Sequence, residues 1–469
     1  MNRHLMILWV GIGLLLGGCS LAPEYISPER PVPDQWPRGE AYRNATAIPG
    51  TPTVQEMKWK DFFADQRLQK IISMALDNNR DLRLAALNVE RARAMYGIQR
   101  AELFPAVNAA GSATAKRVPA DLSSTGKSMT AEEYGVNLGI AAWEIDFFGR
   151  IRSLKDQALE AYLATEQARR SAQTALMAEV AGAWLTLGAD RENLRLARAT
   201  LETQQASYAL IQKSHRIGFA TEIDLRRAQT QVEAARGDIP RYRQQAAQVQ
   251  NALNLLAGAP VPEELLTADL SRMIPLGEMS PGLSSAALLN RPDIIAAEHR
   301  LKGANAFIGA ARSAFFPRIS LTTAVGTASS ELSGLFKAGS DTWTFAPQIV
   351  MPIFDARTWA ALRVSKADRE IVLAQYEKAI QTAFKEVADA LAVQGTIDEQ
   401  VSAQQSLVAA VAETHRLARK RYTLGLDNYL GVLDAQRTLY LQQQVQISLR
   451  LGRLANQVRL YAVLGGGAG

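Results

Sequence analysis

The sequence predicts a mainly α-helical protein with a membrane β-barrel, built from two copies of one helix–strand–strand–helix unit. Three observations lead to this fold class: two long segments lack proline, the sequence repeats internally, and the hydrophobic period changes between the helical segments of each copy. With 469 residues, the chain is long enough to bury a sizeable core.

Long helices are expected where proline is absent, because a proline inside a helix costs about 3 kcal/mol. No proline occurs from Ala120 to Ile239 or from Ile353 to the C-terminus. As one helix, the segment from Arg150 to Arg216 would span roughly 100 Å, a length typical of a solenoid, a coiled coil or a tube. Pro240 falls inside a further expected helix and should kink or interrupt it.

The spacing of apolar residues in these segments predicts coiled packing, with a simple long coiled-coil rod as the alternative. Steps of three and four alternate along two stretches, and the first is broken at Asp190. The positions are Leu176, Val180, Ala183, Leu187, Leu194, Ala197 and Leu201, and then Ile447, Leu451, Leu454, Val458 and Tyr461.

The sequence contains an internal repeat, which is visible when the sequence is aligned with itself at two different shifts. A shift of 212 residues superposes Asp81 on Asp293 and Phe104-Pro105 on Phe316-Pro317, and a shift of 207 superposes Arg150 on Arg357 and Gly218 on Gly425. The five-residue slip must lie between Pro105 and Arg150. Surface loops tolerate such changes of length most easily, so we expect the slip there.

Between the helical segments of each copy, the hydrophobic period becomes that of a strand. Large residues alternate with small or polar ones at Tyr134, Val136, Leu138 and Ile140, and again at Ile319, Leu321, Thr323 and Val325. A soluble half-buried hairpin would show the same alternation. Aromatic residues near the strand ends favour a membrane barrel. Two hairpins leave unpaired edges, which are costly in lipid, so oligomerisation is expected.

The first residues resemble a lipoprotein leader. Arg3 and His4 precede an apolar run that ends in Leu16-Gly17-Gly18-Cys19, so residues 1–18 are expected to be removed and Cys19 to carry lipid. An ordinary signal peptide with an unpaired cysteine is the alternative. Ser20 is typical of outer-membrane rather than inner-membrane lipoproteins. The proline-rich stretch from Pro23 to Pro52 is either an extended arm or a disordered tether.

Composition and charge exclude several functions. The net charge of +6 comes from interspersed residues without a basic cluster, so nucleic acid is not an expected partner. The four histidines are isolated and Cys19 is the single cysteine, so neither a metal site, a disulfide nor a cofactor is expected. No phosphate loop or nucleophile–base pair is visible, so an enzyme is not expected.

The sequence resembles the TolC-like outer-membrane factors over essentially its whole length, specifically the lipidated OprM-like (NodT-type) branch that serves drug efflux pumps. The most specific segments are the lipobox, Trp143-Glu144-Ile145-Asp146-Phe147-Phe148-Gly149-Arg150, Asn290-Arg291-Pro292-Asp293, Phe315-Phe316-Pro317 and Asp427-Asn428-Tyr429-Leu430 followed by Val432-Leu433-Asp434-Ala435-Gln436.

This resemblance implies a homotrimer whose pooled strands form one twelve-stranded barrel in the outer membrane, continued into the periplasm by a tube of twelve helical strands. It implies a passive exit duct for small toxic compounds, with a periplasmic membrane-fusion adaptor and an inner-membrane RND or other transporter as partners. A type I protein-secretion outlet and a lipid-anchored coiled-coil scaffold remain as alternatives.

The expected domain boundaries combine the repeat with the resemblance. A lipidated arm and equatorial segment covers residues 19–65, repeat 1 covers 66–258 with strands at about 104–147, and an equatorial linker covers 259–283. Repeat 2 covers 284–464 with strands at about 316–355, and a C-terminal tail covers 465–469.

Both periplasmic tips are predicted at helix–turn–helix points. Gly218 and Gly425 are expected to adopt the left-handed turn. Thr221 and Asp224 have the spacing of a capping box, and Asp427 is expected to cap the second returning helix.

A gate is implied by the resemblance. In the family, a tyrosine before the second tip latches the inner helix pair to its neighbour, and the matching residues are Tyr422 and Asp224, with Arg421 beside them; Asp224 as a cap alone is the alternative. Asp434 matches a pore-facing aspartate, and Leu430 one turn earlier could form an apolar constriction. Three Asp434 carboxylates would repel one another and select cations, unless Asp434 is a solvated surface residue. Gly431 stands where TolC has a second aspartate, so a doubled acidic ring is not expected.

Overall fold

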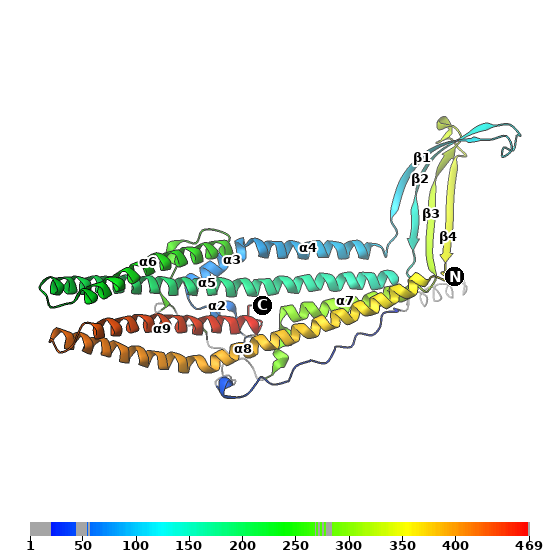
Figure 1. Ribbon diagram of the computed structural model, residues 1–469. Helices are drawn as coiled ribbons and strands as arrows, with labels where there is room; N and C mark the ends of the chain where they lie inside the picture. The colour runs from blue at the N-terminus through cyan, green and yellow to red at the C-terminus, as the bar shows by residue number, and fades with distance from the viewer. Residues whose placement is uncertain are drawn as a thin grey trace. The chain divides into compact units, whose positions relative to one another are not determined.

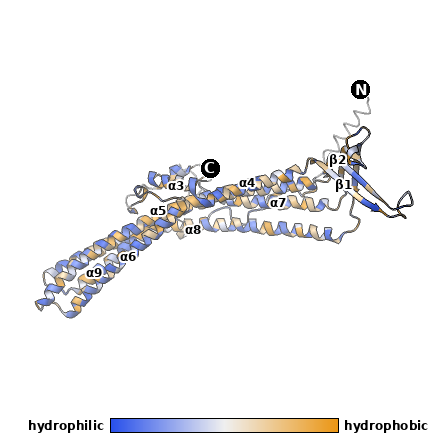
Figure 2. Ribbon diagram, turned by 90° about the horizontal axis from the view of Figure 1, so that it is seen from above, coloured by the Kyte–Doolittle hydropathy of each residue, from blue (hydrophilic) through white to orange (hydrophobic). Residues whose placement is uncertain are grey.

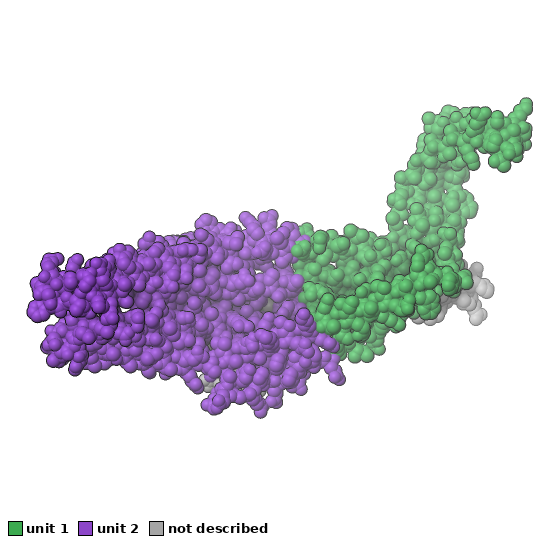
Figure 3. Space-filling view, viewed as in Figure 1, with its two compact units in different colours: residues 1–28, 88–165, 296–376 green, residues 29–87, 166–295, 377–469 purple. Residues whose placement is uncertain are grey.

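The computed structural model describes residues 20–43, 54, 57–267, 269–270, 273, 276–277 and 284–467. The chain divides into two compact units, coloured separately in Figure 3. Unit 1 comprises residues 1–28, 88–165 and 296–376, and unit 2 comprises residues 29–87, 166–295 and 377–469. The predicted leader and the lipidation site at Cys19 lie outside the described residues.

The same series of elements occurs twice along the chain, so the predicted duplication is confirmed (Figure 1). The first copy consists of α4 (Arg80–Ala101), β1 (Val107–Val118), β2 (Met129–Glu144), α5 (Arg150–Arg216) and α6 (Glu222–Ala257). The second consists of α7 (Pro292–Ser313), β3 (Arg318–Ser329), β4 (Asp341–Val350), α8 (Ala356–Thr423) and α9 (Leu430–Val463). The shorter elements are η1 (Glu40–Tyr42), α2 (Trp59–Phe62), α3 (Gln66–Asn78), η2 (Glu263–Leu265), η4 (Ser285–Asn290) and η5 (Leu332–Gly334).

The four strands form one antiparallel sheet in unit 1, in the order β1-β2-β3-β4. Leu138 pairs with Val325, which pairs in turn with Trp343, so these large residues share one face of the sheet. Asn137 and Gly326 are paired on the opposite face, where the residues are small or polar. The alternation predicted from the sequence is therefore confirmed, and β1 and β4 each keep one unpaired edge within a single chain.

The slip between the two copies lies in the strands, and the expectation that surface loops absorb it is wrong. The hairpin loops are similar, spanning residues 119–128 and 330–340, whereas β2 has 16 residues and β4 has 10. The pairing of β2 is irregular between Ile140 and Trp143, and Ala142 there has a φ of 50°. This bulge inserts one residue into β2, and the rest of its extra length is added by a longer strand.

Four of the seven predicted seam residues along α5 are buried, namely Leu176, Val180, Leu187 and Ala197, and coiled packing of this helix stays a prediction. Hydrophobic and hydrophilic residues are interleaved along the long helices (Figure 2). At the break in the seam, burial raises the pKa of Asp190 above its usual value. Among the described helices, none is both long and apolar enough to cross a membrane.

The arm after the predicted lipid anchor contacts helices at several points along residues 20–43. In unit 1, Asn305 donates a hydrogen bond of 2.8 Å to the carbonyl oxygen of Pro23. In unit 2, Trp36 stacks on Phe384 with their ring centroids 5.3 Å apart, and the Ser285 hydroxyl donates to the Pro33 carbonyl. Residues 20–43 therefore form an extended arm rather than a loose tether.

The core of unit 2 joins short segments to the long helices. Phe62 of α2 stacks on Tyr461 of α9 with the ring centroids 4.1 Å apart, and the Trp184 indole donates to the Leu265 carbonyl at 3.0 Å. Phe62, Tyr461 and Trp184 are all buried. These contacts pack α2 against α9 and η2 against α5.

Helix α6 continues through Pro240, so the expected interruption does not occur. Pro240 is exposed, and water can satisfy the backbone carbonyl that loses its partner there. On either side of it, α6 is bonded to α9: the Tyr440 hydroxyl donates to Asp238 at 2.8 Å, and Gln444 donates to the Tyr242 hydroxyl at 2.8 Å. These bonds hold α6 against α9 at the level of the proline.

Candidate functional site: the helical tips

The first tip lies between α5 and α6 and is closed at both helix ends. Gly218 has a φ of 80°, which confirms the predicted left-handed turn. The backbone N–H of Phe219 donates to the Ser214 carbonyl and that of Gly218 donates to the His215 carbonyl, the pair of bonds that ends many helices before a glycine. The capping box is also confirmed, because Thr221 Oγ1 accepts from the Asp224 N–H at 3.2 Å while Asp224 Oδ2 accepts from the Thr221 N–H at 3.1 Å.

The second tip lies between α8 and α9 and is closed differently. Gly425 has a φ of 73° and ends α8 with the same pair of backbone bonds, so its predicted turn is confirmed. The prediction that Asp427 caps α9 is wrong: Tyr429 is the N-cap and makes no side-chain capping bond. Asp427 instead accepts two hydrogen bonds from Arg421, at 2.5 and 3.2 Å. The guanidinium of Arg421 lowers the pKa of Asp427 below its usual value.

A small core joins the two tips within unit 2. It consists of five buried residues: Ile211, Ala228, Tyr429, Val432 and Leu433. Tyr422 packs against this core, and its ring meets that of Tyr429 edge-on with the centroids 5.0 Å apart. The tyrosine that the resemblance assigns to the latch is therefore held by an aromatic neighbour within its own chain.

Asp224 serves as a helix cap in the single chain, and no hydrogen bond between the described atoms of one chain joins it to Tyr422. The expected latch would connect neighbouring copies. The latch therefore stays a prediction. Both hydrogen bonds that Thr221 donates to the carboxylate of Asp224 end on Oδ2, so its Oδ1 is available to a neighbouring copy.

Asp434 and Leu430 are exposed on one face of α9, as their spacing of four residues predicts. Asp434 does not stand alone, because Arg437 donates a hydrogen bond of 2.7 Å to its carboxylate from one turn further along. Three copies would then bring together three acid–base pairs rather than three bare carboxylates. The sequence carried the signal for this pair in the spacing of three residues between opposite charges.

Large apolar side chains flank both tip glycines and point into solvent. Phe219 is 87% exposed and Ile217 is 69% exposed at the first tip, while Leu424 and Leu426 are 63% and 61% exposed at the second. Their position was not singled out from the sequence. The signal was present, because each tip glycine has an apolar residue immediately before and after it.

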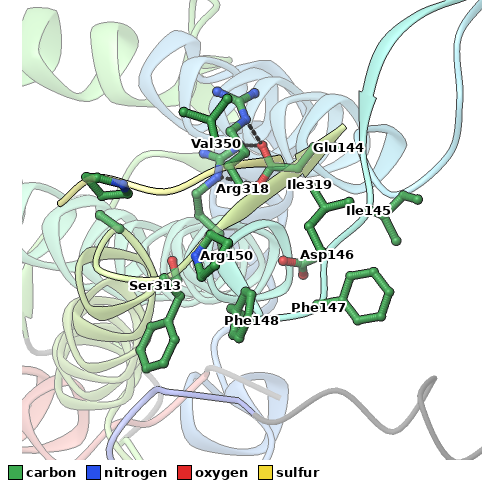
Figure 4. Close-up of a pocket in the computed structure, with 14 residues that line it drawn as sticks. Glu144, Ile145, Asp146, Phe147, Phe148, Arg150, Ser313, Arg318, Ile319 and Val350 are labelled. Carbon is green, nitrogen blue, oxygen red and sulfur yellow. Dashed lines mark hydrogen bonds and ion pairs between the residues drawn. The ribbon is translucent and has the colours of Figure 1, made fainter. Parts of the chain in front are cut away.

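A second polar centre lies where the sheet meets α5 in unit 1 (Figure 4). The Glu144 carboxylate accepts two hydrogen bonds of 2.8 Å from Arg150 and lies 2.5 Å from the Nε of Arg318. An adjoining cavity of about 290 Å³ is lined by this cluster and by aromatic residues, including Phe148 and Phe316, whose rings stack 4.9 Å apart. These ion pairs and the stacked rings anchor the strand ends to the start of α5.

The duplicated unit, the sheet with two open edges and the capped tips define a class of protein: an outer-membrane channel subunit that completes its barrel as a trimer. The chain belongs to the outer membrane efflux protein family, whose model matches residues 71–259 and 283–466. Such proteins are outer-membrane components of tripartite efflux pumps, and they extend into the periplasm. This chain accordingly works as a trimer with an adaptor and an inner-membrane transporter.

Individual relatives cover nearly the whole chain. It is 48% identical to the probable efflux pump outer membrane protein TtgC of Pseudomonas putida, over all of this chain and 96% of the relative. It is 44% identical to outer membrane protein OprJ of Pseudomonas aeruginosa, over 97% of this chain and 94% of the relative. Among solved structures, the open state of the MtrE outer membrane channel of Neisseria gonorrhoeae has a TM-score of 0.86 at 37% identity, over 96% of this chain and 99% of that one.

Proposed function

We propose that this chain forms the passive exit duct through which a tripartite pump expels small organic compounds, without catalysis of its own. Relatives are named for toluene, solvent and antibiotic efflux, and their overall similarity supports cargo of that kind. The observation that carries the proposal is the pair of capped turns with exposed apolar residues at the ends of the two long hairpins. Exposed apolar patches on a soluble part of a protein are typical of interaction sites.

The cargo is tested in a strain that lacks the native gene. Restoring the chain should restore resistance to toluene and to a panel of antibiotics. A type I protein-secretion outlet would instead restore an exported protein and leave susceptibility unchanged. The scaffold alternative predicts no ion conductance from the purified trimer in a planar bilayer.

We propose that the gate is built from Tyr422, Arg421 and Asp224 at the tips and from Leu430 and Asp434 along α9. The ion pair between Arg421 and Asp427 and the packing of Tyr422 on Tyr429 hold these side chains in place at the second tip, which supports this proposal. Lipidation of Cys19 would place the arm at the membrane. The proposed domain boundaries are those predicted above, with repeats at residues 66–258 and 284–464.

Adaptor contact is assigned to the tip turns, centred on Gly218 and Gly425 and held by Thr221 and Asp427. We expect Phe219→Ser combined with Leu426→Ser to abolish most adaptor binding, because each truncation removes about 1–3 kcal/mol of apolar burial at the interface. Chemical cross-linking to the adaptor and antibiotic susceptibility measure the effect.

The matched control for these tip substitutions is Leu332→Ser, which removes a leucine of similar exposure, 67%, from the hairpin loop between β3 and β4. This variant should cross-link normally. Both variants should still run as heat-modifiable trimers. Equal cross-linking of the tip variant and the control would rule out the tips as the contact.

A further inference from the structure

A cleft of about 150 Å³ lies at the second tip, between α5, α8 and α9 of unit 2. Its walls carry the hydroxyl groups of Ser207, Tyr422 and Tyr429. They also carry the guanidinium of Arg419 and the imidazole of His415. None of the described residues that line it is acidic. The cleft therefore offers mainly hydrogen-bond donors and positive charge.

The Tyr429 hydroxyl is an unsatisfied polar group on the wall of this cleft. The residue is 5% exposed, and its hydroxyl has no hydrogen-bond partner among the described residues. Burial raises the pKa of Tyr429, and the nearby Ser207 hydroxyl lowers it by a smaller amount. The two hydroxyls are not placed with the geometry of a hydrogen bond. A buried hydroxyl without a partner costs about 1–3 kcal/mol, so a ligand that accepts its proton would bind favourably.

Arg419 supplies the charge. No ion pair joins it to another described residue, whereas its neighbours Arg416 and Arg421 are paired with Glu413 and Asp427. Burial and, to a smaller extent, the charge of Arg419 lower the pKa of His415, so its imidazole is uncharged at pH 7. The positive charge of the cleft therefore comes from Arg419. One free guanidinium therefore faces a cleft that contains an unsatisfied hydroxyl.

We propose that this cleft binds a small oxyanion, a carboxylate or a phosphate. The planar guanidinium of Arg419 can donate two parallel hydrogen bonds to such a group, which a halide cannot accept in the same way. Tyr429 and Ser207 would donate to the lone pairs that the guanidinium leaves free on its oxygen atoms. An anion held there would bridge α5, α8 and α9, and so would tie the two helical hairpins together beside the tip.

The test uses the purified trimer in an uncharged detergent, with trifluoroacetate as the probe and ¹⁹F NMR line broadening as the readout. We expect the wild type to bind this carboxylate and Arg419→Gln to weaken binding about tenfold or more, as expected for loss of a charged hydrogen bond. Tyr429→Phe, which leaves the ring packing intact, should weaken it several-fold. Lys420→Gln is the matched control, because it removes an adjacent exposed cation outside the cleft and should leave binding unchanged.

Competition identifies the preferred oxyanion. Displacement of the probe by phosphate at a lower concentration than by acetate assigns the cleft to phosphate, and the reverse order assigns it to carboxylates. The proposal is overturned if the wild type shows no binding up to about 10 mM, or if Arg419→Gln and Lys420→Gln weaken it equally. Because the readout is binding, it is independent of transport through the channel.

Discussion

Replacing Tyr422 by phenylalanine should raise the ratio of open to closed trimers by roughly three orders of magnitude. The substitution keeps the ring against Tyr429 and removes the hydroxyl that would reach Asp224 of a neighbouring copy. One hydrogen bond to a carboxylate contributes at least about 1.5 kcal/mol, and three copies together contribute about 4.5 kcal/mol to the closed state. Single-channel conductance in a planar bilayer measures the change, and adding Asp434→Ala should increase it further.

The role of Asp224 as a helix cap can be distinguished from its proposed role in the latch. Thr221→Ala removes the capping hydroxyl but leaves the Asp224 carboxylate, so it should cost about 1 kcal/mol of local helix stability without opening the channel. A Tyr422→Phe trimer with wild-type conductance would show that Asp224 is a cap alone. Non-additive effects of Tyr422→Phe and Asp224→Ala on conductance would locate the latch between these two residues.

The largest effect on assembly is expected from Gly326→Ala in β3. A methyl group there would overlap the Val136 carbonyl oxygen and come within 2.7 Å of Asn137 Cα, both on the paired strand β2. Neither backbone can move without losing the pairing, so the substitution should destabilise each sheet by about 3 kcal/mol or more. Heat-modifiable trimers on a denaturing gel should be largely lost.

Gly111→Ala in β1 is the matched control for this close approach. Its added methyl group would lie 4.0 Å from the nearest atom, the Gly135 carbonyl oxygen, which is ordinary contact. It should assemble like the wild type, with an unchanged melting temperature of the trimer. Normal assembly of Gly326→Ala would contradict the register of β2 and β3.

Local patterns were sufficient to predict the duplication, the strands and the two tip turns, because each depends on residues close together in the sequence. The heptad residues of α5, the alternation around Leu138 and the capping box at Thr221 all have short periods or fixed spacings. Gly218 and Gly425 were predictable because a left-handed turn strongly favours glycine.

The features that the sequence did not predict depend on a choice between partners. Asp427 had a plausible role as a cap, but Arg421 across the turn offers it two charged hydrogen bonds, which are stronger than one capping bond. The bulge near Ala142 in β2 has no distinctive sequence signature. The cleft beside Tyr429 requires three helices to meet, so it is visible only in the folded chain.

The open edges of the four-stranded sheet have a genetic consequence. A single chain leaves the outer edges of β1 and β4 without hydrogen-bond partners, so each subunit depends on its neighbours. A subunit with a damaged edge therefore disrupts every mixed trimer that contains it. If damaged and normal chains are made in equal amounts and mix at random, about one trimer in eight contains normal chains only. Alleles that damage an edge should therefore be dominant over the normal gene, whereas alleles that prevent export of the chain should be recessive.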